Sequence, residues 1–394
     1  MAPRVLTRAV VAAAGAAVGF TATRAGPKLV EWRVERRFNV ANRPPPYQAS
    51  ERARELHGRL LVADLHADSL LYGRDLLRRS AIGHVDVPRL IEGNVALQSL
   101  AACVRVASHL NVERNEDTSD DVRLIALALG WPPSTWRSGL ARALHLAHRA
   151  RAFAERSGGD LRVIETAADL RRYLERRAED PAMTAALLTI EGAAALDGDV
   201  TNVHRLADAG FRLFGLTHMV DNEFAGSSSG VEQGGLTARG RELVGELEAR
   251  RVLVDVAHAS SRTVSDVLGV ARRPVVASHT GVAAVVPSPR SLSDEHVRAI
   301  GATGGVVGIG FWPAVVGGED AAAIARSIAH AVTVAGIDHV ALGSDFDGAV
   351  PAPFDATGMV QLTDALLELG FEDADVAKLM GGNVFRLLAE ALPA

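Results

Sequence analysis

The amino-acid sequence predicts an α/β protein that folds as a (β/α)8 barrel of the TIM type. Three observations support this fold class: eight short apolar runs rich in β-branched residues, helical patterns between most of them, and ionisable residues where the runs stop. A doubly wound parallel sheet is the alternative, because alternating strands and helices do not show whether a sheet closes. The predicted strands span residues 60–66, 95–103, 184–190, 211–217, 252–257, 274–278, 304–310 and 339–344.

Composition restricts the class of protein before any motif is considered. The chain has 394 residues, of which 48% are hydrophobic and 23% are charged, as in soluble proteins with a large core. Its formal net charge of -5 and the lack of a basic stripe give no reason to expect nucleic acid as a partner. Cys103 is the only cysteine, which excludes an intrachain disulfide and a thiolate zinc knuckle. We interpret it as a small buried hydrophobe, with a reactive thiol as the less favoured alternative.

The N-terminus carries a segment that is typical of targeting sequences. Residues 9–23 are uncharged and mostly Ala, Val and Gly, with arginines on both sides. We therefore expect a signal peptide or an uncleaved membrane anchor within residues 1–40, so that the protein is exported or anchored. A cytoplasmic protein with an Ala-rich helix is the alternative. Residues 41–59, which include Pro44-Pro45-Pro46, are expected to form a linker and lead-in to a single domain over residues 60–394.

The first predicted strand ends in a histidine and a carboxylate two positions apart. Residues i and i+2 of a strand project to the same face, so His66 and Asp68 should point into one pocket. An imidazole and a carboxylate together suit a borderline-soft divalent cation such as zinc. Because two ligands leave a site incomplete, further ligands are expected later in the chain.

The second strand is followed by an insertion over about residues 104–183. Its pattern is mostly helical around Trp131-Pro132-Pro133, with a short strand near residues 161–164, and we interpret it as decoration on the barrel. The later strands alternate with helical stretches such as residues 237–250, whose apolar residues recur at three and four spacing. The glycines within residues 303–310 indicate a tightly packed strand, because no helix opens after them as a dinucleotide fingerprint requires.

Several later strands stop at a residue that can bind metal or transfer a proton. In a TIM barrel the carboxyl ends of all strands meet at one mouth, so residues distant in sequence converge there. One histidine at a strand end is commonly an ordinary rim residue, but repeated His, Asp and Glu at strand ends indicate a site. These residues are Glu191, His218, His258, His279 and Asp345.

The residues around these positions form a series of short motifs. In order they are Asp64-Leu-His-Ala-Asp-Ser, Thr189-Ile-Glu-Gly, Leu216-Thr-His-Met-Val-Asp-Asn, Val254-Asp-Val-Ala-His-Ala-Ser, Ala277-Ser-His-Thr, Pro289-Arg-Ser-Leu-Ser-Asp-Glu, Gly343-Ser-Asp-Phe-Asp-Gly and Gly381-Gly-Asn-Val-Phe-Arg. This series resembles the membrane (renal) dipeptidase family of zinc peptidases, from about residue 60 to the C-terminus. The resemblance implies a zinc-dependent dipeptidase that hydrolyses small dipeptides through a metal-bridging hydroxide.

The resemblance also implies how the metals are held. One of two zinc ions would be bound by His66 and Asp68, the other by His258 and His279, and Glu191 would bridge both. A shared carboxylate and a hydroxide are needed there because two close cations repel each other strongly.

Three further residues receive roles from the same resemblance. His218 would stabilise the tetrahedral oxyanion, and Asp345 would move protons, with Asp347 ranked below it. Arg290 would hold the terminal carboxylate of the dipeptide, a task that suits a planar guanidinium. Ser291 stands where an asparagine is usual in the family.

Other motifs of the sequence have ordinary structural explanations. Residues 226–230 match the serine-hydrolase pattern G-x-S-x-G, but no strand precedes them and no helix follows, so we expect a loop that lines the pocket. His145 and His148 share a helical face that is more typical of a plain surface. Two alternative functions stay open: a related barrel hydrolase acting on N-acyl amino acids or cyclic amides, and a non-catalytic zinc-stabilised peptide-binding protein. The oligomeric state is also open, with a homodimer as one option.

Overall fold

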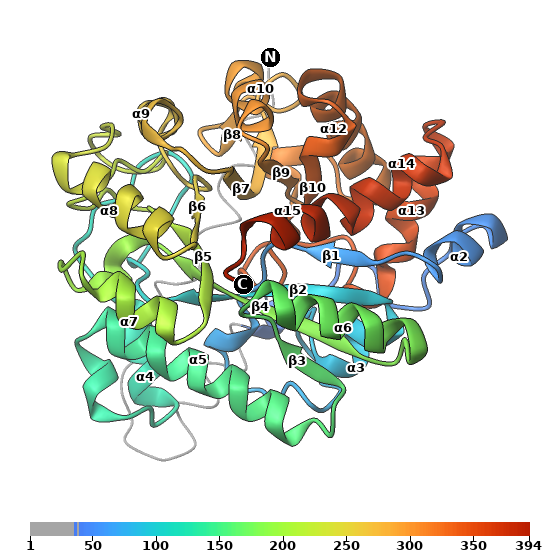
Figure 1. Cartoon of the computed structure of the whole chain (residues 1–394), viewed down its shortest axis with the longest axis horizontal. Coiled ribbons are helices and arrows are strands. Elements are labelled where there is room, and N and C mark those ends of the chain that lie inside the picture. The colour runs from blue at the N-terminus through green and yellow to red at the C-terminus, as the bar shows by residue number, and fades with distance from the viewer. Residues whose placement is uncertain (1–34, 38) are drawn as a thin grey trace.

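The strands of this chain form a closed parallel barrel, as the sequence predicts. The computed structural model describes residues 35–37 and 39–394, so nearly all of the predicted leader lies outside the described residues. Strand β2 pairs with both β1 and β4, which closes the ring and excludes the doubly wound alternative (Figure 1). The ring contains β1 (Val62–Asp64), β2 (Val95–Cys103), β4 (Thr184–Glu191), β5 (Phe211–Gly215), β6 (Leu253–Asp255), β7 (Val275–Val282), β9 (Val306–Ile309) and β10 (Val340–Leu342).

Two short strands extend this ring. β3 (Leu161–Val163) pairs with the start of β4, where the sequence predicts a short strand. β8 (Ser291–Leu292) pairs with the Gly281–Val282 end of β7. β7 continues through His279 because Thr280 still pairs with Ile309 of β9 and the next two residues pair with β8, so the predicted end of this strand at residue 278 was wrong.

Helices surround the outside of the ring and link successive strands (Figure 1). Their first turns are commonly capped by side-chain oxygens, which satisfy backbone N–H groups that have no partner inside the helix. The helices are α2 (Glu51–His57), α3 (Val87–Glu92), α4 (Asp121–Ala128), α5 (Gly139–Arg156), α6 (Ala167–Glu179), α7 (Asn202–Asp208), α8 (Ala238–Ala249), α9 (Ser261–Val270), α10 (Asp294–Ala302), α11 (Pro313–Val316), α12 (Ala321–Ala335), α13 (Met359–Glu368), α14 (Asp373–Ala377) and α15 (Asn383–Ala391). Helix α6 has a full capping box between Thr166 and Asp169.

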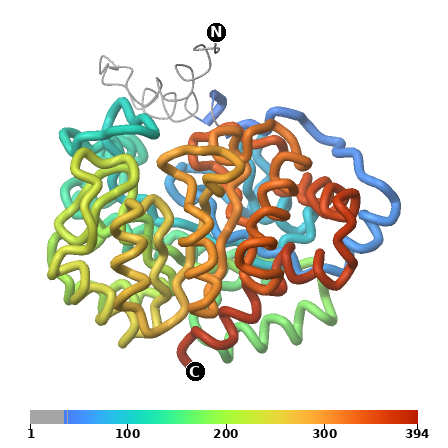
Figure 2. The backbone as a smooth tube through the Cα atoms, turned by 90° about the horizontal axis from the view of Figure 1, so that it is seen from above, coloured from blue at the N-terminus to red at the C-terminus, as the bar shows by residue number. Residues whose placement is uncertain are grey.

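The core divides into a layer inside the barrel and a larger layer between the barrel and its helices. Alternate residues of a strand face opposite sides, so Ala185 and Leu187 of β4 belong to the inner layer while Ala186 and Leu188 pack outwards. Phe385 of α15 packs against the inner layer, so this helix covers one end of the barrel. In Figure 2 the C-terminus lies at the lower edge and the segment after β2 at the upper edge. The mouth formed by the carboxyl ends of the strands is therefore opposite α15.

Close backbone approach explains the glycines of the last strands. A Cβ atom at Gly308 would lie 2.1 Å from the carbonyl oxygen of Ser278, and one at Gly343 would lie 1.9 Å from the same oxygen. Any side chain at either position would push β9 or β10 away from β7. The interpretation of residues 303–310 as part of a tightly packed strand is confirmed.

The segment before the barrel packs on it closely. Ala41 forms a parallel bridge with Ala352, and the hydroxyl of buried Tyr47 accepts a hydrogen bond from the backbone N–H of Asp355. Within the described part of the chain, no helix has both the length and the apolar character needed to cross a bilayer.

Candidate metal centre

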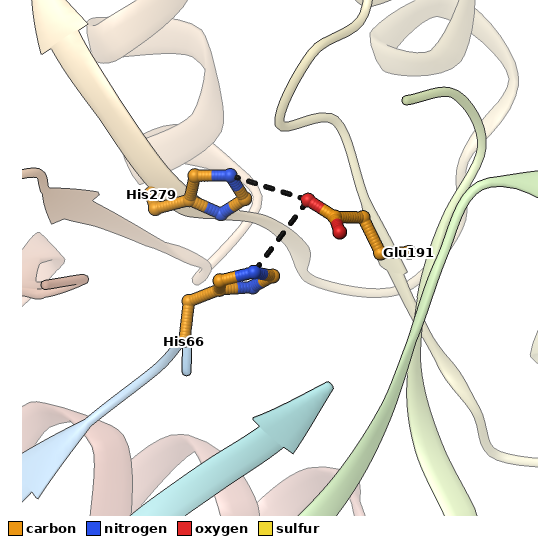
Figure 3. A group of neighbouring side chains, drawn as sticks. All are labelled: His66, Glu191 and His279. Carbon is orange, nitrogen blue, oxygen red and sulfur yellow. Dashed lines mark ion pairs between the residues drawn. The ribbon is translucent and has the colours of Figure 1, made fainter. Parts of the chain in front are cut away.

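Three imidazoles from different parts of the barrel, all from predicted metal ligands, surround one carboxylate oxygen. The Oε1 atom of Glu191 lies 3.1 Å from Nε2 of His258, 3.5 Å from Nε2 of His66 and 3.7 Å from Nε2 of His279. Figure 3 shows His66 and His279 converging on Glu191. Asp68 completes the cluster, with Oδ2 3.5 Å from Nε2 of His66. The structure thus brings all five predicted metal ligands together at the mouth.

The cluster residues differ in where they lie relative to the strands and in their backbone conformation. Glu191 is the last residue of β4, whereas β1 stops at Asp64, so His66 and Asp68 follow the strand instead of ending it. His258 and Asp345 have φ angles of 62° and 61°, a left-handed conformation that costs a non-glycine residue about 1–3 kcal/mol. Such strain persists where the surroundings fix it, and it concentrates at functional sites.

Buried polar atoms without hydrogen-bond partners show that this cluster suits a cation. They are Nε2 of His66, Oδ1 of Asp68, Oε2 of Glu191 and Nδ1 of His258. A buried donor or acceptor with no partner costs about 1–3 kcal/mol, so four in one cluster need an explanation. Imidazole nitrogens and carboxylate oxygens are the ligands that zinc takes in catalytic sites. The cluster therefore fits metal ions by its chemistry as well as by its geometry.

The charges in the cluster depend strongly on each other. Burial lowers the pKa of the His66 imidazole, but the nearby Glu191 and Asp68 carboxylates outweigh it and raise this pKa to about 10. Burial and the charge of Glu191 raise the pKa of Asp68 to about 6. Burial keeps the pKa of His279 well below its usual value, so this imidazole is neutral and able to bind a metal.

Two buried aspartates outside the cluster orient its members. The carboxylate of Asp255 accepts hydrogen bonds from the hydroxyl and backbone N–H of Ser278, and this hydroxyl lies 2.9 Å from Nδ1 of His279. Asp64 likewise accepts from the hydroxyl and N–H of Ser344, and that hydroxyl also donates to the carbonyl oxygen of His66. Partners of this kind fix the orientation of metal-binding side chains.

Asp345 and Asp347 differ sharply in their surroundings. Asp347 is fully buried and accepts hydrogen bonds from the hydroxyl of Ser69, the guanidinium of Arg74 and the backbone N–H of His84. These contacts, mainly the charge of Arg74, hold its pKa below the usual value. Asp345 lies with His66 and Asp68 in a group whose candidate ligand atoms are within 4.8 Å of one another, and burial raises its pKa. Asp345 therefore lies in the cluster, whereas Asp347 is held outside it by Ser69, Arg74 and His84.

His218 occupies the edge of the cluster. Its Nε2 lies 3.6 Å from Oε1 of Glu191, and its side chain is 16% exposed, more than those of the other cluster residues. The loop that contains residues 226–230 holds it in place, because the hydroxyl of Ser227 donates to the carbonyl oxygen of His218. No strand precedes this loop directly, and α8 begins only at Ala238, so the expectation of a loop instead of a serine-hydrolase elbow is confirmed.

Arg290 supplies a buried positive charge beside the cluster. Its Nη2 atom donates to the carbonyl oxygen of His279, and its guanidinium lies 5.8 Å from the centre of the Trp312 ring. Among the described residues no carboxylate forms an ion pair with it, although the side chain is buried. Burial lowers its pKa, and the nearby carboxylate of Asp345 opposes this effect. A ligand carboxylate would give this cation a partner.

Sequence reasoning missed several residues of this region. The sequence could have indicated Asp255, because it is the one charged residue within the apolar run 252–257. Cys103 was interpreted as a buried hydrophobe. It is buried, but its sulfur faces His218 at 4.0 Å from Nδ1. His145 is half-buried and packs against the ring of Trp131. Of the two histidines expected on a plain helix surface, only His148 is exposed.

Comparison with known proteins places this arrangement in a family. The family profile described as membrane dipeptidase, peptidase family M19, matches residues 50–393. An uncharacterised protein of the pqqA 5' region of Klebsiella pneumoniae is 35% identical over 247 residues, which cover 59% of this chain and 89% of that protein. The dipeptidase aclJ of Aspergillus oryzae is 32% identical over 220 residues, 53% of this chain and 52% of the relative, so the match spans about half of that protein.

Solved structures of related enzymes have the same fold. A metallopeptidase from Rhodobacter sphaeroides, bound to a phosphinate mimic of the dipeptide L-Ala-D-Ala, superposes with a TM-score of 0.68 at 25% identity, over 84% of this chain and 99% of that one. The dipeptidase AC of family M19 gives a TM-score of 0.67 at 27% identity, over 85% and 99%. The chain belongs to the membrane dipeptidase family of metallopeptidases, peptidase family M19.

Proposed function

We propose that this protein is a zinc-dependent dipeptidase that hydrolyses the peptide bond of small dipeptides. The observation that carries the proposal is the convergence of three imidazole nitrogens on Oε1 of Glu191 at 3.1–3.7 Å, in a cluster whose members keep polar atoms without hydrogen-bond partners. Family membership supports a metal-dependent peptidase.

Two zinc ions would share the cluster. His66 and Asp68 would hold one ion, His258 and His279 would hold the other, and the carboxylate of Glu191 would serve both. Nε2 of His258 lies 2.9 Å from Nε2 of His279, so these two imidazoles are near enough to bind the same ion. When bound, zinc lowers the pKa of coordinated water from 15.7 to about 7 and so supplies a nucleophile at neutral pH.

The remaining residues would act on the substrate. His218 would donate an N–H to the oxygen of the attacked carbonyl, where negative charge develops in the transition state. Asp345 would accept a proton from the attacking water and pass it to the leaving amine, a role for which a raised pKa is suitable. The guanidinium of Arg290 would bind the C-terminal carboxylate of the dipeptide and so exclude longer chains.

The substrate assignment draws on the relatives. The Aspergillus oryzae protein bears the name dipeptidase, and the Rhodobacter sphaeroides enzyme was crystallised with a mimic of L-Ala-D-Ala. We therefore propose that the test panel include L-Ala-L-Ala and L-Ala-D-Ala.

A panel of dipeptides assayed with and without a chelator tests the function. We expect release of both amino acids, loss of turnover with the chelator, and recovery with zinc. N-acetyl dipeptides separate the closest rival, since an N-acyl amino acid hydrolase would prefer them to the free dipeptides. Zinc and dipeptide binding without any turnover would instead identify a binding protein.

Export or membrane attachment through the N-terminus stays a prediction, because residues 9–23 lie outside the described residues. A homodimer is likewise only a prediction. Cell fractionation of the full chain and of a chain lacking residues 1–34 tests the first, and sedimentation tests the second.

A further inference from the structure

Cys103 lies at the mouth of the barrel beside two residues of the candidate centre. It is the last residue of β2, and its register partner on β4 is Glu191. Its Sγ atom lies 4.0 Å from Nδ1 of His218. Together Cys103, Glu191 and His218 form a group whose candidate ligand atoms all lie within 4.8 Å of one another.

These three residues offer a different set of donors from the two-ion centre. A thiolate, an imidazole and a carboxylate suit soft d10 cations, and the proposed pair of zinc ions uses neither Cys103 nor His218. The carboxylate of Glu191 can bind a third ion in addition to the proposed pair, because its two oxygens carry about four lone-pair sites. Oε2 of Glu191 is buried without a hydrogen-bond partner, and the side chain of Glu191 is 5% exposed.

The distance between the sulfur and the imidazole allows both to bind one ion after only a small movement. Zinc binds sulfur at about 2.3 Å and imidazole nitrogen at about 2.0–2.1 Å, which puts the two ligand atoms roughly 3.6 Å apart in a tetrahedral site. The separation of 4.0 Å between Sγ of Cys103 and Nδ1 of His218 needs to close by a few tenths of an ångström. His218 has the most exposed side chain of the cluster, and its Nδ1 also lies 3.4 Å from the carbonyl oxygen of Arg105, a contact that an ion at Nδ1 would replace.

We propose that Cys103, His218 and Glu191 form a third, inhibitory metal position that takes soft cations such as Cd2+, or Zn2+ in excess. The thiol releases its proton to solvent as the sulfur–metal bond forms. An ion held there occupies the imidazole of His218 and fills the space in which the substrate carbonyl would lie. The inhibitory consequence rests on the proposed dipeptidase function, whereas the binding of the ion does not.

Titration of the zinc-loaded protein with Cd2+ tests the proposal. A thiolate bound to cadmium has a charge-transfer absorption in the ultraviolet, and Cys103 is the only cysteine of the chain. Cadmium that exchanges into the sites of imidazoles and carboxylates gives no such band. We expect a band that saturates at one Cd2+ per chain in parallel with the loss of dipeptide turnover. Cys103→Ser should show no band.

A second variant distinguishes a shared site from an isolated thiol. Loss of even an outer partner of a metal ligand weakens binding about 10-fold to 100-fold, so His218→Ala should raise the midpoint of the band at least about tenfold. His148→Ala, which removes an exposed histidine of α5, should leave the midpoint unchanged. A wild-type protein that binds Cd2+ without a band overturns the proposal, as does an unchanged midpoint in His218→Ala. A band with the expected shift but no dipeptide turnover at any stage refutes only the proposed function.

Discussion

Replacing Arg290 by methionine tests the proposed carboxylate-binding role. The guanidinium is buried beside the metal cluster, and among the described residues no carboxylate pairs with it. Methionine has a similar length without the charge, and removing an unpaired buried charge should not destabilise the fold. The variant therefore isolates the interaction with substrate.

The expected loss follows from the electrostatics of the site. Two unit charges about 4 Å apart interact by about 4 kcal/mol at an effective dielectric constant of 20. Truncating one partner of a buried charge pair costs about 2–5 kcal/mol, equivalent to about a 30-fold to 5000-fold loss. We expect kcat/KM for a dipeptide with a free C-terminus to fall within this range in Arg290→Met.

The matched comparison uses the same dipeptide with a C-terminal amide, which lacks the charge that Arg290 would bind. Its already low kcat/KM should change less than about fivefold. Arg298→Met, which removes an exposed arginine of α10, serves as the control variant. An equal loss for the acid and the amide would refute the assignment, because Arg290 would then act on something other than the carboxylate.

Three further predictions address proton transfer, the loop that follows β10, and the metals. Asp345→Asn should keep its bound zinc but lose about 10²-fold to 10⁴-fold in kcat, and an unchanged kcat would remove Asp345 from the mechanism. Arg74→Met leaves the buried carboxylate of Asp347 without its cation, so urea unfolding should show a loss of about 3–5 kcal/mol; a loss below about 1 kcal/mol would contradict the structural role of the pair. Because His66 has a pKa of about 10 in the metal-free protein, zinc must displace its proton, and the affinity should fall about tenfold for each pH unit below 10. Competition with a chelator at pH 6, 7 and 8 measures this slope, and a flat profile would contradict the pKa assignment.

The barrel and the convergence of its strand ends were predictable because both follow from local patterns. Apolar runs of strand length mark β4 and β7, and a parallel barrel brings their carboxyl ends to one mouth whatever the details of packing. The exact ends of strands were less predictable, since β7 passes through His279 because its last two residues pair with β8 and Thr280 pairs with Ile309 of β9. Nothing in the apolar run 274–278 signals those distant partners.

The surroundings of the centre depend on contacts between residues far apart in sequence. Asp347 and Arg74 are separated by 273 positions, and their pairing becomes visible only when the loop after β10 meets the segment after β1. The position of Cys103 beside the centre depends in the same way on the register of β2 against β4, which places it opposite Glu191. A single sequence contains neither register nor loop packing, so it predicted which residues gather at the mouth and not the groups that orient them.

The metal content of the purified protein tests the central claim most directly. Protein loaded with excess zinc and then dialysed against metal-free buffer should contain two zinc ions per chain by elemental analysis, and Cys103→Ala should contain the same two. Since Glu191 lies within 3.7 Å of imidazoles from both proposed ion sites, Glu191→Gln should retain fewer ions. One zinc ion per chain in the fully loaded wild-type protein would contradict the bridged pair.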